Sequence, residues 1–198
     1  MIKANNLSKS FNGNRIFSGI NLIVKKSTIL GVVGNNGSGK TTLLKIVAGI
    51  INSDTGNINL NANIKLDFLG HENMLYQNFS ISENIDFFSD ISGFRISSEL
   101  QDEIEKALGL QNILGKKISD LSYGQRKKAS MLRSLISSPD LLVLDEPFSN
   151  LDSESTDSFI SILKTLKKEN KSVIISSNRK DVVGLVSDDL LNMDDYNE

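Results

Sequence analysis

Nine consecutive residues could bind a phosphate chain. The segment Gly-Asn-Asn-Gly-Ser-Gly-Lys-Thr-Thr fits the pattern G-x-x-x-x-G-K-[ST]. Its glycines let backbone N–H groups point inward at phosphate oxygens, its lysine supplies a charge for the β- and γ-phosphates, and the next hydroxyl can ligate Mg²⁺. The pattern therefore predicts a nucleoside triphosphate site made of Gly34, Asn35, Asn36, Gly37, Ser38, Gly39, Lys40, Thr41 and Thr42.

A second acidic site follows the apolar run 141–144, which ends in Asp145 and Glu146. Such a run is typical of a buried parallel strand, whose carboxyl end faces the ligand crevice of an α/β sheet. Successive strand residues point to opposite sides, so the two carboxylates have different tasks. We expect Asp145 to hold the Mg²⁺ shell with Thr41, and Glu146 to polarise the attacking water as general base. Catalysis is thus assigned to Glu146 with Lys40.

A third segment, Leu-Ser-Tyr-Gly-Gln at 121–125, precedes a basic helix pattern. Ser122 is a good N-cap for a helix over 123–137, and the positive end of that helix would point at an anion. Taken alone, the segment is no more than a helix start.

The three segments together resemble the ATP-binding cassette (ABC) ATPases, and the likeness covers nearly the whole chain. In that family the pentapeptide acts on the ATP held by a second subunit, so the resemblance implies a head-to-tail homodimer that sandwiches two ATP molecules with Mg²⁺. It implies nucleotide contacts from Ser122, Gly124 and Gln125, a coupling D-loop at 149–152, and an integral-membrane permease as partner.

Two positions depart from the common family pattern. Gly70-His71-Glu72 stands where most members have a glutamine, and Asn178 stands where most have a histidine that contacts the γ-phosphate. We expect Asn178 to be a third catalytic residue beside Glu146 and Lys40. Its side chain can donate a hydrogen bond but carries no charge, so we expect slower hydrolysis than with histidine. His71, the only histidine, could sense phosphate or be merely structural. A regulatory cassette with little hydrolysis stays an alternative.

Leu-Gly-His at 69–71 and Ser-Glu-Asn-Ile at 82–85 are similar to the ATP-binding subunit of the cytochrome c maturation system, a haem exporter. That likeness implies haem export, with haem-handling proteins as further partners. ATPases of other ABC exporters, or soluble cassettes acting on ribosomes or DNA, are the alternatives. Phe11, one aromatic residue after the first expected strand, is the candidate for stacking on adenine, although a packed core role suits it equally.

The elements needed to position these residues can also be read from the pattern. Residues 28–33 suit a buried strand before the loop, and apolar residues at helical spacing follow it. The order of β-type segments, a helical stretch and then alternating strands and helices predicts an α/β fold. The family resemblance further implies a P-loop NTPase core of ABC type, an N-terminal antiparallel β subdomain and a helical signature subdomain over about 72–137, all in one nucleotide-binding domain spanning 1–198. Strands are expected at 64–69 and 172–176, and a capping box at Ser80 and Glu83.

Composition and net charge narrow the range of functions further. The chain has 198 residues, a net charge of −2 and no cysteine, which excludes disulfides and thiolate metal sites and gives no electrostatic reason to bind nucleic acid. No apolar run reaches the roughly eighteen residues of a membrane helix. Together with the permease partner that the resemblance implies, this leads us to expect a peripheral protein on the cytoplasmic face of the inner membrane, or on the matrix face in an organelle. The basic run Arg126-Lys127-Lys128 is interpreted as a solvated helix face.

Overall fold

The computed structural model describes residues 2–61, 63–70, 74–93 and 95–196. Its strands are β1 (Ile2–Phe11), β2 (Asn14–Val24), β3 (Ile29–Val33), β4 (Thr55–Leu60), β5 (Leu66–Leu69), β6 (Leu141–Asp145), β7 (Ser172–Ser177) and β8 (Asp189–Asn192). Its α-helices are α1 (Lys40–Val47), α2 (Ile81–Ser92), α3 (Ser98–Ala107), α4 (Tyr123–Ile136), α5 (Ser153–Lys168) and α6 (Lys180–Gly184). Short 3₁₀ turns occupy Gln111–Ile113, Ile118–Asp120 and Met193–Tyr196. Within these residues no helix is long and apolar enough to cross a membrane.

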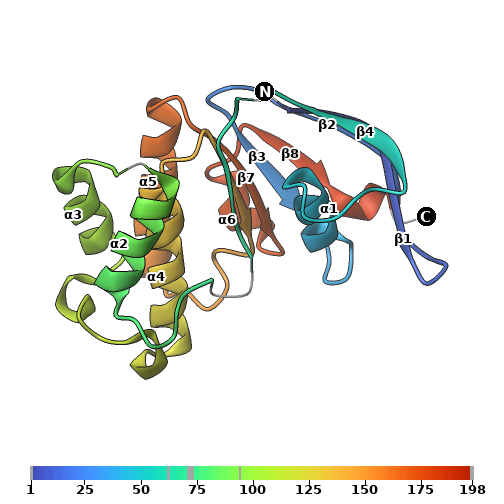
Figure 1. The fold of residues 1–198 in the computed structure, drawn as a ribbon. Helices are drawn as coiled ribbons and strands as arrows, with labels where there is room; N and C mark the ends of the chain where they lie inside the picture. The colour runs from blue at the N-terminus through green and yellow to red at the C-terminus, as the bar shows by residue number, and fades with distance from the viewer. Residues whose placement is uncertain (1, 62, 71–73, 94, 197–198) are drawn as a thin grey trace.

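The strands form two sheets. One is antiparallel with the order β2-β1-β4, and the other is parallel with the order β5-β6-β7-β3-β8. Helices α2 to α5 gather on one side of the parallel sheet, and α1 lies on the other side with the antiparallel sheet (Figure 1). Because β3, β7 and β6 are neighbours and run in the same direction, the segments after them meet at one edge of the sheet.

The parallel sheet has an apolar layer on each face, because alternate residues of its strands point to opposite sides. On β6, Leu142 and Leu144 pack towards α4 and α5, whereas Leu141 and Val143 pack towards α1. Strands β3 and β7 alternate in the same way. Burial on both faces explains why these strands are nearly continuous apolar runs.

Close contact between β3 and its neighbours depends on Gly31. A Cβ atom at this position would lie 2.5 Å from a methyl group of Val183 and 2.6 Å from atoms of Leu190 and Ser187. Any side chain here would therefore push α6 or β8 away from the strand that leads into the phosphate loop.

Local sequence signals set the helix starts. Ser80 caps α2 and Ser122 caps α4, each within a reciprocal capping box, and the Asp152 carboxylate caps α5 by accepting from Ser155 N. The predicted α/β fold class is confirmed, including the antiparallel sheet. The helical segment is also present, and it lies between β5 and β6 in the chain. The boundaries differ slightly: the strand expected at 64–69 begins at Leu66, and the helix expected over 123–137 ends at Ile136.

Candidate functional site

The phosphate loop connects β3 to α1 and is wrapped around the Lys40 ammonium. Lys40 Nζ donates to the carbonyl oxygens of Gly34 at 2.8 Å and Asn35 at 2.9 Å. Gly39 has φ +88°, and a Cβ there would lie 2.7 Å from Ile16 Cγ2, so only glycine fits this position. Helix α1 starts without a side-chain cap and without an acidic residue in its first turn. Its N-terminal N–H groups are therefore available for an anion.

Asp145 lies at the carboxyl end of β6, two strands from the loop. Its Oδ2 accepts the Thr41 hydroxyl at 2.8 Å, and its Oδ1 accepts the Ser176 hydroxyl at 2.7 Å from the intervening strand β7. The buried carboxylate and the hydroxyl beside it offer hard oxygen ligands, which Mg²⁺ prefers. Substrate phosphates and water would complete the coordination shell of the ion. In the described part of the chain no cluster of three or more histidine, cysteine or acidic residues could hold a metal alone.

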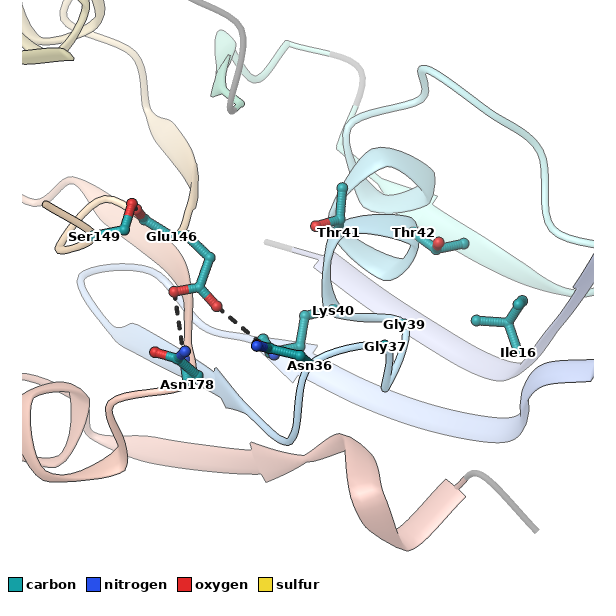
Figure 2. A pocket seen from close by; sticks show the side chains of 10 residues that line it. All are labelled: Ile16, Asn36, Gly37, Gly39, Lys40, Thr41, Thr42, Glu146, Ser149 and Asn178. Carbon is teal, nitrogen blue, oxygen red and sulfur yellow. Dashed lines mark hydrogen bonds and ion pairs between the residues drawn. The ribbon is translucent and has the colours of Figure 1, made fainter. Parts of the chain in front are cut away.

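The Glu146 carboxylate contacts the phosphate loop at Lys40 and the backbone at Asn178. Its Oε1 lies 3.7 Å from Lys40 Nζ, and its Oε2 accepts the Asn178 backbone N–H at 3.4 Å (Figure 2). The backbone of Glu146 is left-handed, with φ +50°, which is unusual for a residue with a side chain. The surrounding structure must hold this conformation.

Lys40, Thr41 and Glu146 line one cavity of about 410 Å³, the size of a small-molecule site, and Asp145 adjoins it through its hydrogen bond with Thr41. Figure 2 shows Thr41 and Thr42 on α1 facing Glu146 and Asn178 across it. The lining consists of Ile16, Asn36, Gly37, Gly39, Lys40, Thr41, Thr42, Glu146, Ser149 and Asn178. The structure thus brings together most of the phosphate loop, the second carboxylate and the asparagine that stands in the histidine position.

The pentapeptide at 121–125 does not line this cavity. Ser122 Oγ accepts the Gln125 backbone N–H at 3.2 Å, and the Gln125 side chain accepts the Ser122 N–H at 3.0 Å. Gly124 adjoins the loop after β6, since a Cβ on it would lie 3.9 Å from the Asn150 carbonyl oxygen. Ser122, Gly124 and Gln125 can therefore act on a nucleotide only from a place outside this chain's own cavity.

Phe11 and His71 are the two remaining predicted nucleotide contacts. Phe11 ends β1 and is 46% exposed, with the Lys9 ammonium 5.1 Å from its ring centroid, and the structure does not bring it into the cavity lining. His71 lies outside the described residues.

The expectation of a solvated face at Arg126-Lys127-Lys128 is wrong for Lys127, which is only 7% exposed. Lys127 Nζ donates to the carbonyl oxygens of Glu146 at 2.6 Å and Ser149 at 3.0 Å, and to Ser149 Oγ. Burial lowers the Lys127 pKa to about 8, against the opposing attraction of Glu146 and Asp145. The sequence shows no sign of this because α4 meets the loop after β6 only through tertiary packing.

Ser176 was also missed, although a signal existed. Strand β7 is apolar from Val173 to Ile175 and ends in two serines, Ser176 and Ser177, and polar residues at that end of a parallel strand face the crevice. Both are buried. The Ser176 hydroxyl donates to Asp145 and accepts the backbone N–H of Glu146.

Known proteins are similar to this chain in sequence and in fold. The ABC transporter family matches residues 17–149. An uncharacterized ABC transporter ATP-binding protein of Methanocaldococcus jannaschii is 34% identical over 96% of this chain and 72% of its own length, and a zinc import ATP-binding protein of Wolbachia pipientis is 34% identical over 90% and 73%. Among solved structures, a dimeric ATP-binding cassette bound to ADP and Pi has a TM-score of 0.83 at 20% identity, covering 97% of this chain and 94% of that one.

Proposed function

We infer that this chain, which belongs to the ABC transporter family, is a subunit that hydrolyses ATP within its β3–α1 cavity and drives a membrane permease. ATP binding and hydrolysis follow from family membership. The residue roles are our proposal. The observation that carries them is the divergence of the two carboxylates, with Asp145 bonded to Thr41 and Glu146 facing Lys40.

Several side chains of the cavity have a proposed role in ATP hydrolysis. Lys40 and the N-terminus of α1 bind and orient the phosphates. Glu146 holds the attacking water and takes up its proton at a carboxylate oxygen. Asn178, at the same side of the cavity, donates a hydrogen bond to the γ-phosphate but brings no positive charge. Mg²⁺ held by Thr41 and Asp145 would neutralise charge on the phosphates.

The site is incomplete in one chain, which supports a head-to-tail homodimer. Ser122 and Gly124 lie at the N-terminus of α4 outside the cavity. The Ser122 N–H already donates to Gln125, whereas Gly124 is in the first turn, where an N–H has no partner within its own helix and can meet a nucleotide held by another copy. The solved dimeric cassette with the same fold supports this arrangement. Two chains would then enclose two ATP molecules.

The permease would dock on the surface of the helical segment. Tyr76, Phe79, Phe87 and Phe88 form one aromatic cluster, in which Tyr76 is 49% and Phe79 38% exposed. A hollow of about 270 Å³ lined by Met74, Leu75, Tyr76 and Phe88 adjoins it. An exposed apolar patch of this kind is typical of a protein interface. Association with a permease would keep this subunit at the membrane surface.

For the transported substrate we propose haem, as part of cytochrome c maturation. The support is Leu69-Gly70-His71 and the Ser82–Ile85 segment. The relatives have other names: those similar at 30–34% identity include proteins for zinc import, methionine import and lipoprotein release. Identity at this level does not distinguish among such substrates, so another ABC transporter remains the competing proposal.

The decisive test of hydrolysis compares the wild-type protein with Glu146→Gln. We expect the variant to bind ATP and to lose turnover by on the order of 10² to 10⁴. Equal, slow turnover by both proteins would favour a regulatory cassette over an ATPase.

The test of partner and substrate isolates the tagged chain from its native membranes under gentle solubilisation. A multi-span protein together with haem-handling proteins supports haem export, and a different permease discards haem while retaining the mechanism. Recovery only with ribosomes or DNA refutes the transporter proposal. Tyr76→Ser should reduce permease recovery without changing ATP affinity.

A further inference from the structure

Lys127 is a buried cation that the proposed mechanism has not used. It lies on α4, five residues after Ser122, and its side chain passes into the loop between β6 and α5. All three acceptors around its ammonium belong to that loop: the Glu146 carbonyl oxygen, the Ser149 carbonyl oxygen and Ser149 Oγ. Three donors thus meet three acceptors, which satisfies a cation that burial would otherwise penalise.

The loop that Lys127 holds is a tight turn. The Ser149 N–H and the Ser149 hydroxyl both donate to the Glu146 carbonyl oxygen, at 3.2 and 2.9 Å. Lys127 donates to the same oxygen at 2.6 Å. One carbonyl therefore accepts three hydrogen bonds, and the orientation of its peptide is tightly determined.

The same peptide carries the proposed general base. Glu146 has the left-handed φ of +50°, which a glutamate does not adopt without external support. The Glu146 N–H donates to the Ser176 carbonyl oxygen at 3.2 Å and to the Ser176 hydroxyl at 3.0 Å. On the other side, the Glu146 carbonyl oxygen accepts from Lys127. The two anchors fix the direction in which the Glu146 side chain leaves the backbone, towards Lys40.

We propose that Lys127 is a positioning residue that holds the Glu146–Ser149 turn in its catalytic conformation and thereby links the pentapeptide helix to the general base. This inference rests on the proposed function. Because Lys127 and Ser122 share α4, a nucleotide met by Ser122 in a dimer acts on the same rigid helix that holds this chain's own Glu146. Lys127 is not itself a lining residue of the cavity; it contacts the lining residues Glu146 and Ser149 and acts through Glu146.

The test compares Lys127→Met, which keeps the apolar stem and removes the donors, with Lys127→Arg and with Lys128→Met, the neighbouring lysine on the same helix. For Lys127→Met we expect kcat to fall on the order of 10- to 100-fold, with ATP affinity and KM unchanged within about twofold. Lys127→Arg should recover part of the loss, and Lys128→Met should resemble the wild-type protein.

A second comparison separates positioning from a general loss of structure. In the Glu146→Gln background, Lys127→Met should cause no further loss of residual turnover, because its effect passes through Glu146. Wild-type kcat in Lys127→Met, an equal fold-loss in both backgrounds, or a loss of ATP affinity as large as the loss of kcat overturns the proposal. If Lys127→Met does not fold, Lys127→Gln replaces it with the same readouts. An active wild type and an inactive Glu146→Gln keep the proposed function intact whichever way Lys127 behaves.

Discussion

Two serines occupy the same structural position on different helices, and this allows the role of the pentapeptide to be tested apart from its contribution to folding. Ser122 starts α4 and Ser80 starts α2, each with a capping box. The Oγ-to-N distance is 3.2 Å in both. Ser80 is buried, whereas Ser122 is exposed. Only Ser122 belongs to the segment that we place against a partner's nucleotide.

The structure sets the expected stability changes. Replacing an N-cap serine by alanine costs about 0.5–2 kcal/mol. Ser122→Ala should lie near the lower end, because water can reach the freed Gln125 N–H, and Ser80→Ala near the upper end, because its site is buried. For a chain of this size about 1 kcal/mol lowers Tm by roughly 2–4 °C. Ser122→Gly should cost only a few tenths of a kcal/mol while still removing the hydroxyl.

The assay measures urea unfolding by circular dichroism and ATP turnover over a range of protein concentrations, since a dimeric site makes specific activity rise with concentration. We expect Ser122→Ala and Ser122→Gly to lose turnover far beyond their loss of stability, and Ser80→Ala to lose stability with turnover retained. If both alanine variants kept wild-type turnover at temperatures where they are folded, the assignment of Ser122 to the nucleotide site would be refuted.

Four further outcomes are expected. Asn178→His should raise kcat at saturating ATP, because a histidine can carry charge to the γ-phosphate; an unchanged kcat means that residue 178 does not contact it. Thr41→Val should gain less nucleotide affinity from Mg²⁺ than the wild type does, measured by calorimetry with an EDTA control, because Asp145 is then the one proposed protein ligand left; an unchanged Mg²⁺ effect contradicts the assignment of Thr41. Phe11→Ala should weaken ATP binding by about 1–3 kcal/mol and Phe11→Trp should not; equal affinity of all three proteins removes Phe11 from the adenine site. Finally, burial lowers the pKa of Lys127 from its ordinary value of 10.5 to about 8 in the folded protein. Between pH 8 and pH 10.5 the unfolded chain therefore binds more protons than the folded chain. Wild-type stability should therefore rise relative to Lys127→Met by up to about 1.4 kcal/mol per pH unit from pH 8 to 10.5 in denaturant titrations, and a difference that does not change with pH would contradict the lowered pKa of Lys127.

The local parts of the molecule could be predicted from the sequence. The phosphate loop, the acidic pair and both capping boxes are each formed within a few consecutive residues, so spacing alone indicates them. The apolar runs before Gly34 and Asp145 also indicated a sheet buried on both faces, and the fold class followed.

Contacts between distant segments could not be obtained in this way. Thr41 and Asp145 are 104 positions apart, and they meet because β7 pairs with both β3 and β6, an order that no local pattern encodes. The same holds for Lys127, whose helix position looks solvated until the loop after β6 is packed against it.

The sequence by itself determined which groups could bind phosphate, ligate Mg²⁺ and activate water, since these depend on residue type and short spacing. Tertiary structure alone decided that Glu146 faces Lys40, that Ser176 supports Asp145, that Phe11 lies outside the cavity lining and that Lys127 is buried. The physical reason is that strand order and helix packing are collective results of burying apolar surface, and they set the surroundings of each polar side chain.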